Sequence, residues 1–259
     1  MKRLHLFEFE DKSWFPTIIR NYMTDYLQFV TNSMNFYEGI VPILKKGLAK
    51  TSNNTIVDLA SGGGGGWLKL SKQLDKELPD TKIVLSDYYP NINAFEYNIN
   101  QINGRISYQK ESVNALDVPN HLEGFRTMFL SFHHFQPNEA KQILENAVNS
   151  NQPIAIFEAQ ERSIGQLVQF FFSPIFVLLM TPLIRPLKVG RFLLTYLLPL
   201  VPMFVWWDGL VSVLRTYTID EMLELATQSD KNQAYHWEAS KIKSGPTEIL
   251  YLLGIPKNN

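Results

Sequence analysis

Asp58 and the five glycines Gly62–Gly66 form the stretch of the chain with the clearest capacity for chemistry. Glycine tolerates positive φ and lets a ligand approach the backbone closely. The β-favouring residues 55–57 lead into Asp58, and after the glycines a helical pattern begins. Its apolar residues recur at spacings of three and four, at Trp67, Leu70, Leu74 and Leu78. The stretch predicts a strand, a cofactor-binding loop, and a helix whose N-terminus offers free N–H groups and a positive dipole end.

The spacing of the glycines separates two classes of cofactor. A dinucleotide-binding loop needs G-x-G-x-x-G, and counting from Gly62 the third glycine is replaced by Trp67. The pattern acidic-x-G-x-G-x-G fits better, with alanine for the first glycine. The residues that match it or lie within it are Asp58, Ala60, Ser61, Gly62 and Gly64. A flexible glycine linker is the alternative, but linkers are not entered by a buried strand and left by an amphipathic helix.

This pattern resembles motif I of the class I S-adenosylmethionine (SAM) methyltransferases. The resemblance covers residues 50–160 and extends to 216–256. It implies an α/β fold with a Rossmann-like seven-stranded sheet, one antiparallel strand, N-terminal helices over the pocket, and SAM as the cofactor. Besides 55–57, we expect strands at 82–86, 106–110, 126–131, 153–157, 235–243 and 247–253, with a helix after a capping box at Thr218 and Glu221.

The resemblance also assigns residues to the nucleoside of the cofactor. An acid after the second strand binds the ribose in that family, and Asp87 lies there, about twenty-five residues past Gly62. Tyr88 could pack on the adenine. Ser112 and Val113 stand where the family places a pair that binds the adenine amino group. A solvent-exposed turn is the alternative for Asp87.

Candidate bases follow the fourth and fifth expected strands, where ligands bind in open α/β sheets. Histidine titrates near neutrality and can take the proton of a hydroxyl acceptor. Adjacent residues on an extended chain point to opposite faces, so we expect one histidine to face the substrate, His133 rather than His134. Glu158 is the second candidate. Since it is the one obvious carboxylate at these strand ends, no metal site is expected. Packing roles are the alternative for both histidines.

Residues 1–50 are expected to form a helical cap that covers cofactor and substrate. Its candidate substrate contacts are Trp14, Arg20, Tyr22 and Asp25, with ordinary helix packing as the alternative. Asp208 and Arg215 are polar groups beside a very apolar segment. We expect them either to pair with each other, as buried charges usually need partners, or to contact the substrate.

Residues 166–207, here called the insert, do not belong to the minimal sheet. Two apolar runs flank a basic turn with Arg185, Lys188 and Arg191. Each run is about fifteen residues long and broken by prolines, whereas a membrane span needs about 20. The basic turn would also oppose the positive-inside tendency. We expect a mobile, removable helical cap over an apolar substrate pocket, an in-plane membrane contact, or a dimer interface.

The composition limits the function further. The net charge of −1 favours no nucleic-acid partner, and the absence of cysteine excludes disulfides and thiolate catalysis. The N-terminus lacks the apolar region of a signal peptide. We expect a single cytoplasmic domain of residues 1–259, peripheral to the inner membrane face if the insert binds lipid. Its predicted function is SAM-dependent O-methylation of a small apolar or lipid-like acceptor. The alternative is a catalytically silent SAM-fold protein that uses the insert for membrane or partner association.

Overall fold

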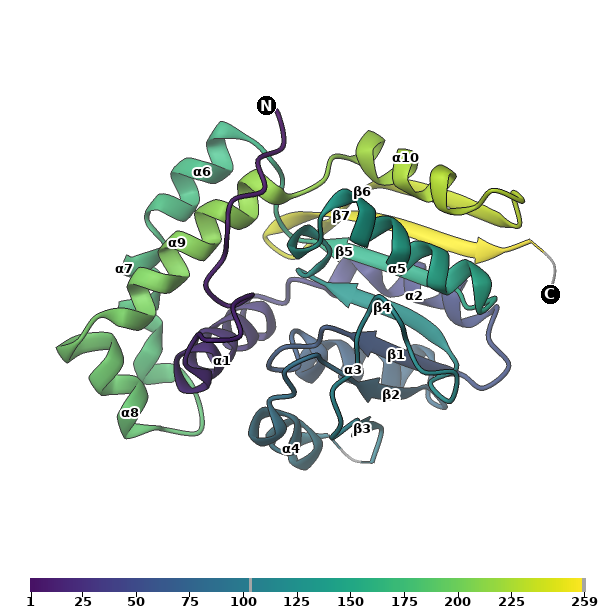
Figure 1. Ribbon diagram of the computed structural model, residues 1–259. Coiled ribbons are helices and arrows are strands. Elements are labelled where there is room, and N and C mark those ends of the chain that lie inside the picture. The colour runs from purple at the N-terminus through teal and green to yellow at the C-terminus, as the bar shows by residue number, and fades with distance from the viewer. Residues whose placement is uncertain (103, 258–259) are drawn as a thin grey trace.

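The predicted seven-stranded sheet is present in the computed structural model, which describes residues 1–102 and 104–257 (Figure 1). Its strand order is β3-β2-β1-β4-β5-β7-β6, and β7 runs antiparallel to both β5 and β6. The strands are β1 (Thr55–Leu59), β2 (Lys82–Leu85), β3 (Ile106–Tyr108), β4 (Phe125–Phe129), β5 (Ile154–Glu158), β6 (Tyr235–Ser244) and β7 (Thr247–Pro256). The predicted fold class is therefore confirmed.

Helices cover both faces of the sheet because the buried strands are apolar on each side. One face packs against α2 (Val41–Leu48), α3 (Trp67–Glu77) and α4 (Ile92–Gln101). The other packs against α5 (Pro137–Asn149) and α10 (Ile219–Ser229). The predicted capping box opens α10: the Thr218 backbone N–H donates to Glu221 Oε2 at 2.8 Å, and the Glu221 N–H donates to Thr218 Oγ1 at 3.3 Å.

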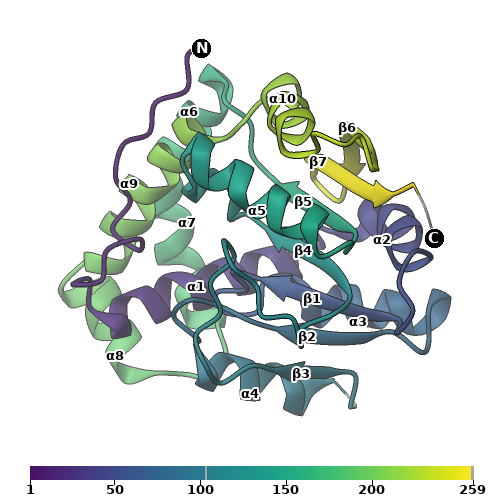
Figure 2. The same cartoon turned by 45° about the vertical axis from the view of Figure 1, so that its right-hand side comes forward.

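A separate helical layer lies beside the sheet, made by α1 (Thr17–Ser33) and the helices of the insert (Figures 1 and 2). The latter are α6 (Ile164–Phe171), α7 (Ser173–Met180), α8 (Val189–Phe192) and α9 (Leu200–Arg215), with a π-helical stretch at Leu193–Leu197. Their shared apolar cluster includes Ile19 and Met23 of α1 together with Val177 and Val201 of the insert. The insert is helical as predicted, and it packs against one face of α1.

The first fifteen residues, here called the N-terminal segment, were expected to be helical and are not. The segment follows an irregular path along α9 (Figure 2). Its backbone is fastened there: the Leu4 N–H donates to the Leu214 carbonyl at 3.1 Å, and the Phe9 N–H donates to Asp208 Oδ1 at 2.8 Å. The helical expectation failed because tertiary contacts with α9 satisfy these backbone groups.

The basic turn of the insert is partly neutralised by α1. Asp25 accepts hydrogen bonds from Lys188 Nζ at 2.7 Å and from Arg191 Nη1 at 2.8 Å. Arg191 is 1% exposed, so its charge faces protein, whereas Arg185 lies in solvent. Asp25 is therefore committed to joining α1 to the insert.

Among the described residues, no single helix is both long enough and apolar enough to span a membrane. Two bent pairs reach the required length and composition together. Ile164–Phe171 with Ser173–Leu183 bends by 43°, and Val189–Leu197 with Leu200–Arg215 bends by 76°.

The glycine loop between β1 and α3 is shaped by its protein neighbours as well as by any ligand. Gly64 has φ +90°, and a Cβ there would lie 1.9 Å from Asn98 Nδ2. A Cβ on Gly66 would lie 2.2 Å from the Tyr37 ring. The approach of Tyr37 explains the glycine at position 66, which the acidic-x-G-x-G-x-G pattern does not require.

Ala60, which stands for the first glycine of that pattern, has φ +52°. This backbone region costs an L-residue roughly 1–2 kcal/mol. Ala60→Gly should remove that strain, while the looser unfolded chain takes back about 0.5–1 kcal/mol. We predict that Ala60→Gly raises the free energy of unfolding by up to about 1 kcal/mol, measured by urea denaturation. In the matched control Ala49→Gly, at φ −59°, stability should fall. Equal losses in both variants would contradict strain at Ala60.

Candidate active site

A buried carboxylate organises the strand ends around the loop. Asp58 accepts hydrogen bonds from Trp67 Nε1 at 2.9 Å and from Thr127 Oγ1 at 2.8 Å. Burial raises the pKa of Asp58 to about 7, although these donors and Ser61 oppose the shift. The side chain ties β1 to the first turn of α3 and to β4, and it also forms part of the pocket wall.

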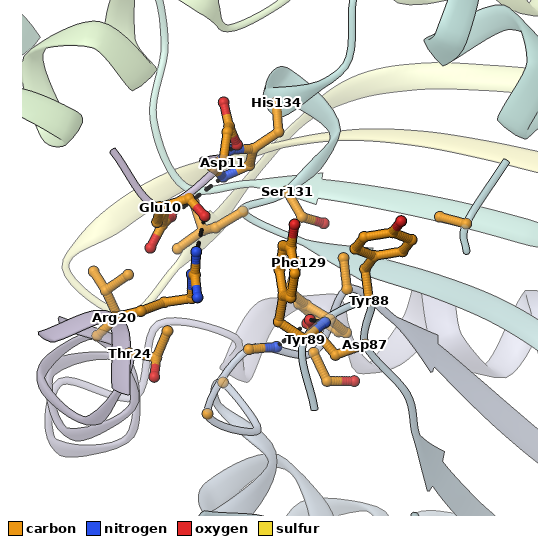
Figure 3. A pocket seen from close by; sticks show the side chains of 18 of the residues that line it. Glu10, Asp11, Arg20, Thr24, Asp87, Tyr88, Tyr89, Phe129, Ser131 and His134 are labelled. Atoms are coloured by element: carbon orange, nitrogen blue, oxygen red, sulfur yellow. Dashed lines mark hydrogen bonds and ion pairs between the residues drawn. The ribbon is translucent and has the colours of Figure 1, made fainter. Parts of the chain in front are cut away.

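The pocket is a cavity of about 540 Å³ at the carboxyl ends of β1, β2 and β4 (Figure 3). That volume lies within the range of small-molecule sites. Its walls come from the glycine loop, the segments after β2, β3 and β4, helix α1 and the N-terminal segment. None of its described lining residues lies within 166–207, but α9, which begins in the insert, contributes Arg215 just beyond it.

One side of the cavity, here called the cofactor end, contains most of the predicted cofactor residues. Asp87 Oδ2 accepts from the Gly62 N–H and Oδ1 from the Tyr89 N–H, each at 2.7 Å. Burial raises the pKa of Asp87 above its ordinary value, and the two N–H donors oppose that shift. The predicted residues that line this end are Asp58, Ala60, Ser61, Gly62, Asp87, Tyr88 and Val113.

Two predicted cofactor residues do not line the cavity. Gly64 faces Asn98, and Ser112 is exposed and donates its hydroxyl to the Tyr88 carbonyl at 2.8 Å. Sequence reasoning missed Asn114 and Ala115, which follow Val113 along the wall.

Helix α1 packs against the glycine loop and forms hydrogen bonds near the N-terminus of α3. Asn32 Nδ2 donates to the Gly65 carbonyl at 2.7 Å, and the Lys69 N–H donates to Asn32 Oδ1 at 2.9 Å. A Cβ on Gly63 would lie 3.0 Å from the Thr24 carbonyl oxygen. One backbone N–H near the start of α3, that of Lys69, is therefore satisfied by α1.

The opposite side of the cavity, here called the charged end, holds Glu10, Asp11, His134 and Arg215 (Figure 3). His134 Nδ1 lies 2.7 Å from Asp11 Oδ1, and His134 Nε2 lies 3.5 Å from Glu10 Oε1. Arg215 Nη1 donates to Asp11 Oδ2 at 2.7 Å. Both cations are thus paired with acids of the N-terminal segment.

These charges fix the protonation of the charged end. Burial alone would lower the pKa of His134, but the carboxylates of Glu8, Asp11 and Glu10 raise it to about 10. Burial raises the pKa of Glu10, and the neighbouring acids add to that rise while His134 opposes it. At neutral pH His134 is an imidazolium, which donates N–H groups but accepts no proton.

His133 and Glu158 lie beneath the pocket and do not line it. His133 Nδ1 is 3.0 Å from Glu158 Oε2, and both side chains are buried. The two histidines belong to a 3₁₀ turn, Phe132–His134, and their ring centroids are 4.4 Å apart. One histidine borders the cavity as expected, but it is His134 and not His133, and the chain there is a 3₁₀ turn and not an extended strand. His133 does not line the cavity and His134 is protonated at neutral pH, so neither is favoured as the base.

Of the predicted substrate contacts, some line the cavity and others do not. Arg215 and Arg20 line the cavity, whereas Trp14, Tyr22 and Asp25 do not. Tyr22 is buried in the cluster shared with the insert, and Trp14 is 67% exposed. The expected pair between Asp208 and Arg215 is absent among the described contacts of these residues. Asp208 instead accepts from the backbone N–H groups of Phe9 and Glu10 at 2.8 and 3.2 Å.

The acids of the N-terminal segment are the main feature that sequence reasoning missed. The stretch E-F-E-D, residues 8–11, carries three acids in four positions, and that signal was visible. It brings Glu8, Glu10 and Asp11 to the end of β4, so Glu158 is not the one carboxylate there. A carboxylate cluster is therefore present at this strand end, and the reason for expecting no metal site does not hold.

No protein-family model matches the chain, and no curated protein matches it. Among solved structures, PigF with S-adenosylhomocysteine aligns with a TM-score of 0.51 and 16% identity, covering 95% of this chain and 63% of PigF. The pyocyanin biosynthetic protein PhzM aligns at 0.49 and 14% identity, covering 87% and 56%. A SAM-dependent methyltransferase from Aquifex aeolicus aligns at 0.49 and 13%, covering 90% and 97%. The chain spans about three fifths of PigF and PhzM, and the match to PigF shows a shared fold.

Proposed function

We propose that the protein is a SAM-dependent methyltransferase that methylates an oxygen atom of a small acceptor. One observation carries this proposal: a single cavity joins the cofactor end, with its glycine loop and Asp87, to the charged end. The fold shared with PigF, whose structure contains S-adenosylhomocysteine, supports it. A catalytically silent SAM-binding protein would need the cofactor end alone.

The cofactor would lie with its ribose at Asp87 and its amino-acid part along residues 60–63. Each Asp87 oxygen accepts one backbone N–H, which leaves lone pairs for the two ribose hydroxyls. The side chain of Tyr88 would lie beside the adenine, and Val113, which follows β3, would also contact the adenine. Residues 60–63 line the cavity without bulky side chains, so the ligand can approach their backbone.

The reaction would be an in-line displacement. The acceptor oxygen forms a bond to the methyl carbon while the bond from that carbon to sulfur breaks. Sulfur keeps the electron pair and becomes a neutral thioether, and the hydroxyl proton of the acceptor passes to a base. Because the sulfonium is already activated, the protein contributes mainly alignment and exclusion of water.

Glu10 is the base we propose. It lines the charged end, and its raised pKa makes it a better proton acceptor than an ordinary glutamate. The His134 imidazolium, 3.5 Å away, would hold the carboxylate in place and favour its ionised form. Here Glu10 takes the role first expected of His133, His134 or Glu158.

The lining also limits the acceptor. Its reacting group must be polar to suit the charged end, while Leu27, Leu116, Phe129 and Phe135 supply apolar wall. A hydroxyl on a compact apolar body fits both. This retains the small apolar acceptor expected from the sequence.

The insert is proposed to contact a membrane surface. Most of the exposed large apolar side chains of the described chain lie on or beside it, including Phe171, Phe176, Leu179, Leu187 and Leu197. Large contiguous apolar surfaces are rare on monomeric soluble proteins, so exposed apolar side chains gathered on one segment are typical of a binding surface. Exposed Arg185 stands between exposed Leu183 and Leu187, a combination that suits an anionic lipid surface.

Asp87→Asn should weaken binding of SAM and S-adenosylhomocysteine by about tenfold to hundredfold. The amide still accepts from one backbone N–H but loses the charged acceptor for the ribose, worth about 1–3 kcal/mol. Calorimetry measures the change, and Asp80→Asn on the exposed turn before β2 is the control. NADH should bind the wild type much more weakly than SAM. Affinity within twofold of wild type in Asp87→Asn would remove this residue from the cofactor site.

Glu10→Gln should slow methyl transfer by about 10²-fold while leaving cofactor affinity unchanged. Production of S-adenosylhomocysteine would be followed with small aromatic and aliphatic alcohols. Because the ionised form is the base and its pKa is raised, wild-type activity should increase with pH along a limb above the usual glutamate value of 4.5. That limb should vanish in Glu10→Gln and persist in Glu38→Gln. Full turnover in Glu10→Gln would rule out this base, and no turnover of any alcohol by the SAM-bound wild type would favour the silent alternative.

The double variant Leu179→Glu with Leu197→Glu should abolish co-sedimentation with anionic phospholipid vesicles. The two side chains are 68% and 73% exposed, so charge there should leave the fold and cofactor binding intact. Met34→Glu, an exposed position outside the insert, is the control. The membrane proposal is wrong if the wild-type protein does not co-sediment with the vesicles and instead forms a dimer that the double variant dissociates.

A further inference from the structure

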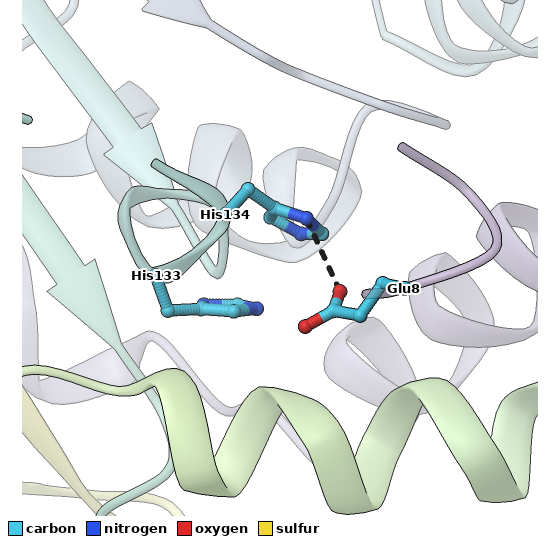
Figure 4. Close-up of side chains that lie close together, drawn as sticks. All are labelled: Glu8, His133 and His134. Carbon is cyan, nitrogen blue, oxygen red and sulfur yellow. Dashed lines mark ion pairs between the residues drawn. The ribbon is translucent and has the colours of Figure 1, made fainter. Parts of the chain in front are cut away.

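A buried cluster of two histidines and a glutamate lies directly beneath the charged end. Glu8, His133 and His134 each offer a ligand atom, and these atoms all lie within 4.8 Å of one another. Figure 4 shows both imidazoles facing the Glu8 carboxylate. Glu8 is 0% exposed and His133 is 2% exposed, whereas His134 is partly exposed and borders the cavity.

The tautomer of His133 leaves one ring nitrogen without a partner. Glu158 only accepts hydrogen bonds, so His133 Nδ1, at 3.0 Å, must be the donor. The other ring nitrogen, Nε2, is buried and has no hydrogen-bond partner among the described residues. The same holds for both carboxylate oxygens of Glu8. Buried polar atoms without partners are costly, and a cation bound between these side chains would satisfy them.

The surrounding groups favour such a cation. The carboxylates of Glu8, Glu10, Asp11 and Glu158 all contact one of the two histidines. Arg215, whose Nη1 lies 2.9 Å from Glu8 Oε1, is the counter-charge on the far side. Both ion pairs of Glu8, to Arg215 and to His134, lack hydrogen-bond angles, so the carboxylate oxygens keep lone pairs free.

We propose that Glu8, His133 and His134 bind a divalent transition-metal ion of the zinc class. The ion displaces the proton that His134 carries in the ion-free protein. Two imidazoles and one carboxylate are the donors that such ions accept. A ligating histidine usually donates its other N–H to a carboxylate, as His133 does to Glu158. Metal–ligand bonds of about 2.0–2.2 Å hold ligand atoms at most about 4.4 Å apart, so small side-chain shifts complete the site.

The ion would fasten the N-terminal segment to the end of β4. Glu8 comes from that segment, whereas both histidines belong to the turn after β4. The segment also carries Glu10 and Asp11 into the cavity, so the ion would hold the charged end in position. This role does not depend on SAM binding or on the identity of the acceptor.

The test is a titration of the chelator-treated full-length chain with Co²⁺, followed by its visible absorption and by competition with Zn²⁺. We expect one saturable site per chain that Zn²⁺ displaces. Glu8→Gln and His133→Asn should lose the site, and Glu158→Gln should weaken it by about 10–100-fold, as for other partners of metal ligands. His121→Asn, at an exposed histidine, should bind as wild type.

Limited proteolysis of the wild type provides a second readout that needs no variant. Co²⁺ or Zn²⁺ should slow cleavage within the N-terminal segment severalfold, and chelator should reverse the protection. The proposal is overturned if wild type shows no saturable binding and no protection. It is also overturned if folded Glu8→Gln and His133→Asn bind the ion as tightly as wild type, since a proton shared by His133 and Glu8 would then be the cation.

Discussion

The hydrogen bonds of the buried Asp58 carboxylate are the constraint on which the rest of the site depends. One oxygen accepts from Trp67 at the start of α3, and the other accepts from Thr127 on β4. A buried carboxylate is costly unless its oxygens are satisfied, so these two contacts fix where the loop leaves β1 and where α3 begins. The glycine loop is held at its other side as well, because the Gly62 N–H donates to Asp87 Oδ2 after the end of β2.

The second constraint is the position of α1 between the pocket and the insert. Its inner side brings Arg20 and Thr24 to the cavity, while Asp25 and Tyr22 join the helix to the insert. The N-terminal segment depends on α9 in the same way, through Asp208. The insert and α9, which continues from it, therefore support the pocket by fixing α1 and the N-terminal segment, and α9 also contributes Arg215 to the lining.

The sheet and the cofactor end could be predicted from the sequence because their signals are local. A β-favouring run ending in Asp58, a glycine loop and an amphipathic helix each follow from spacing, and Asp87 lies at the next strand end. The charged end could not be predicted, since it joins residues 8–11 to His134 and Arg215 by contacts distant in the chain. The 3₁₀ turn at Phe132–His134 was also not predicted, and His134 rather than His133 borders the cavity. The sequence also did not indicate that Asp208 accepts from the backbone N–H of Phe9. Nor did it indicate that Arg191 donates to Asp25.

The central claim is that one cavity holds the cofactor at Asp87 and presents its methyl group to the charged end. The most direct measurement is a crystal structure of the protein with S-adenosylhomocysteine. The account predicts ribose hydroxyls on Asp87, the amino-acid part along Ala60–Gly63, and the sulfur directed toward Glu10 and His134. S-adenosylhomocysteine bound outside this cavity, or bound there with its sulfur directed away from the charged end, would contradict it.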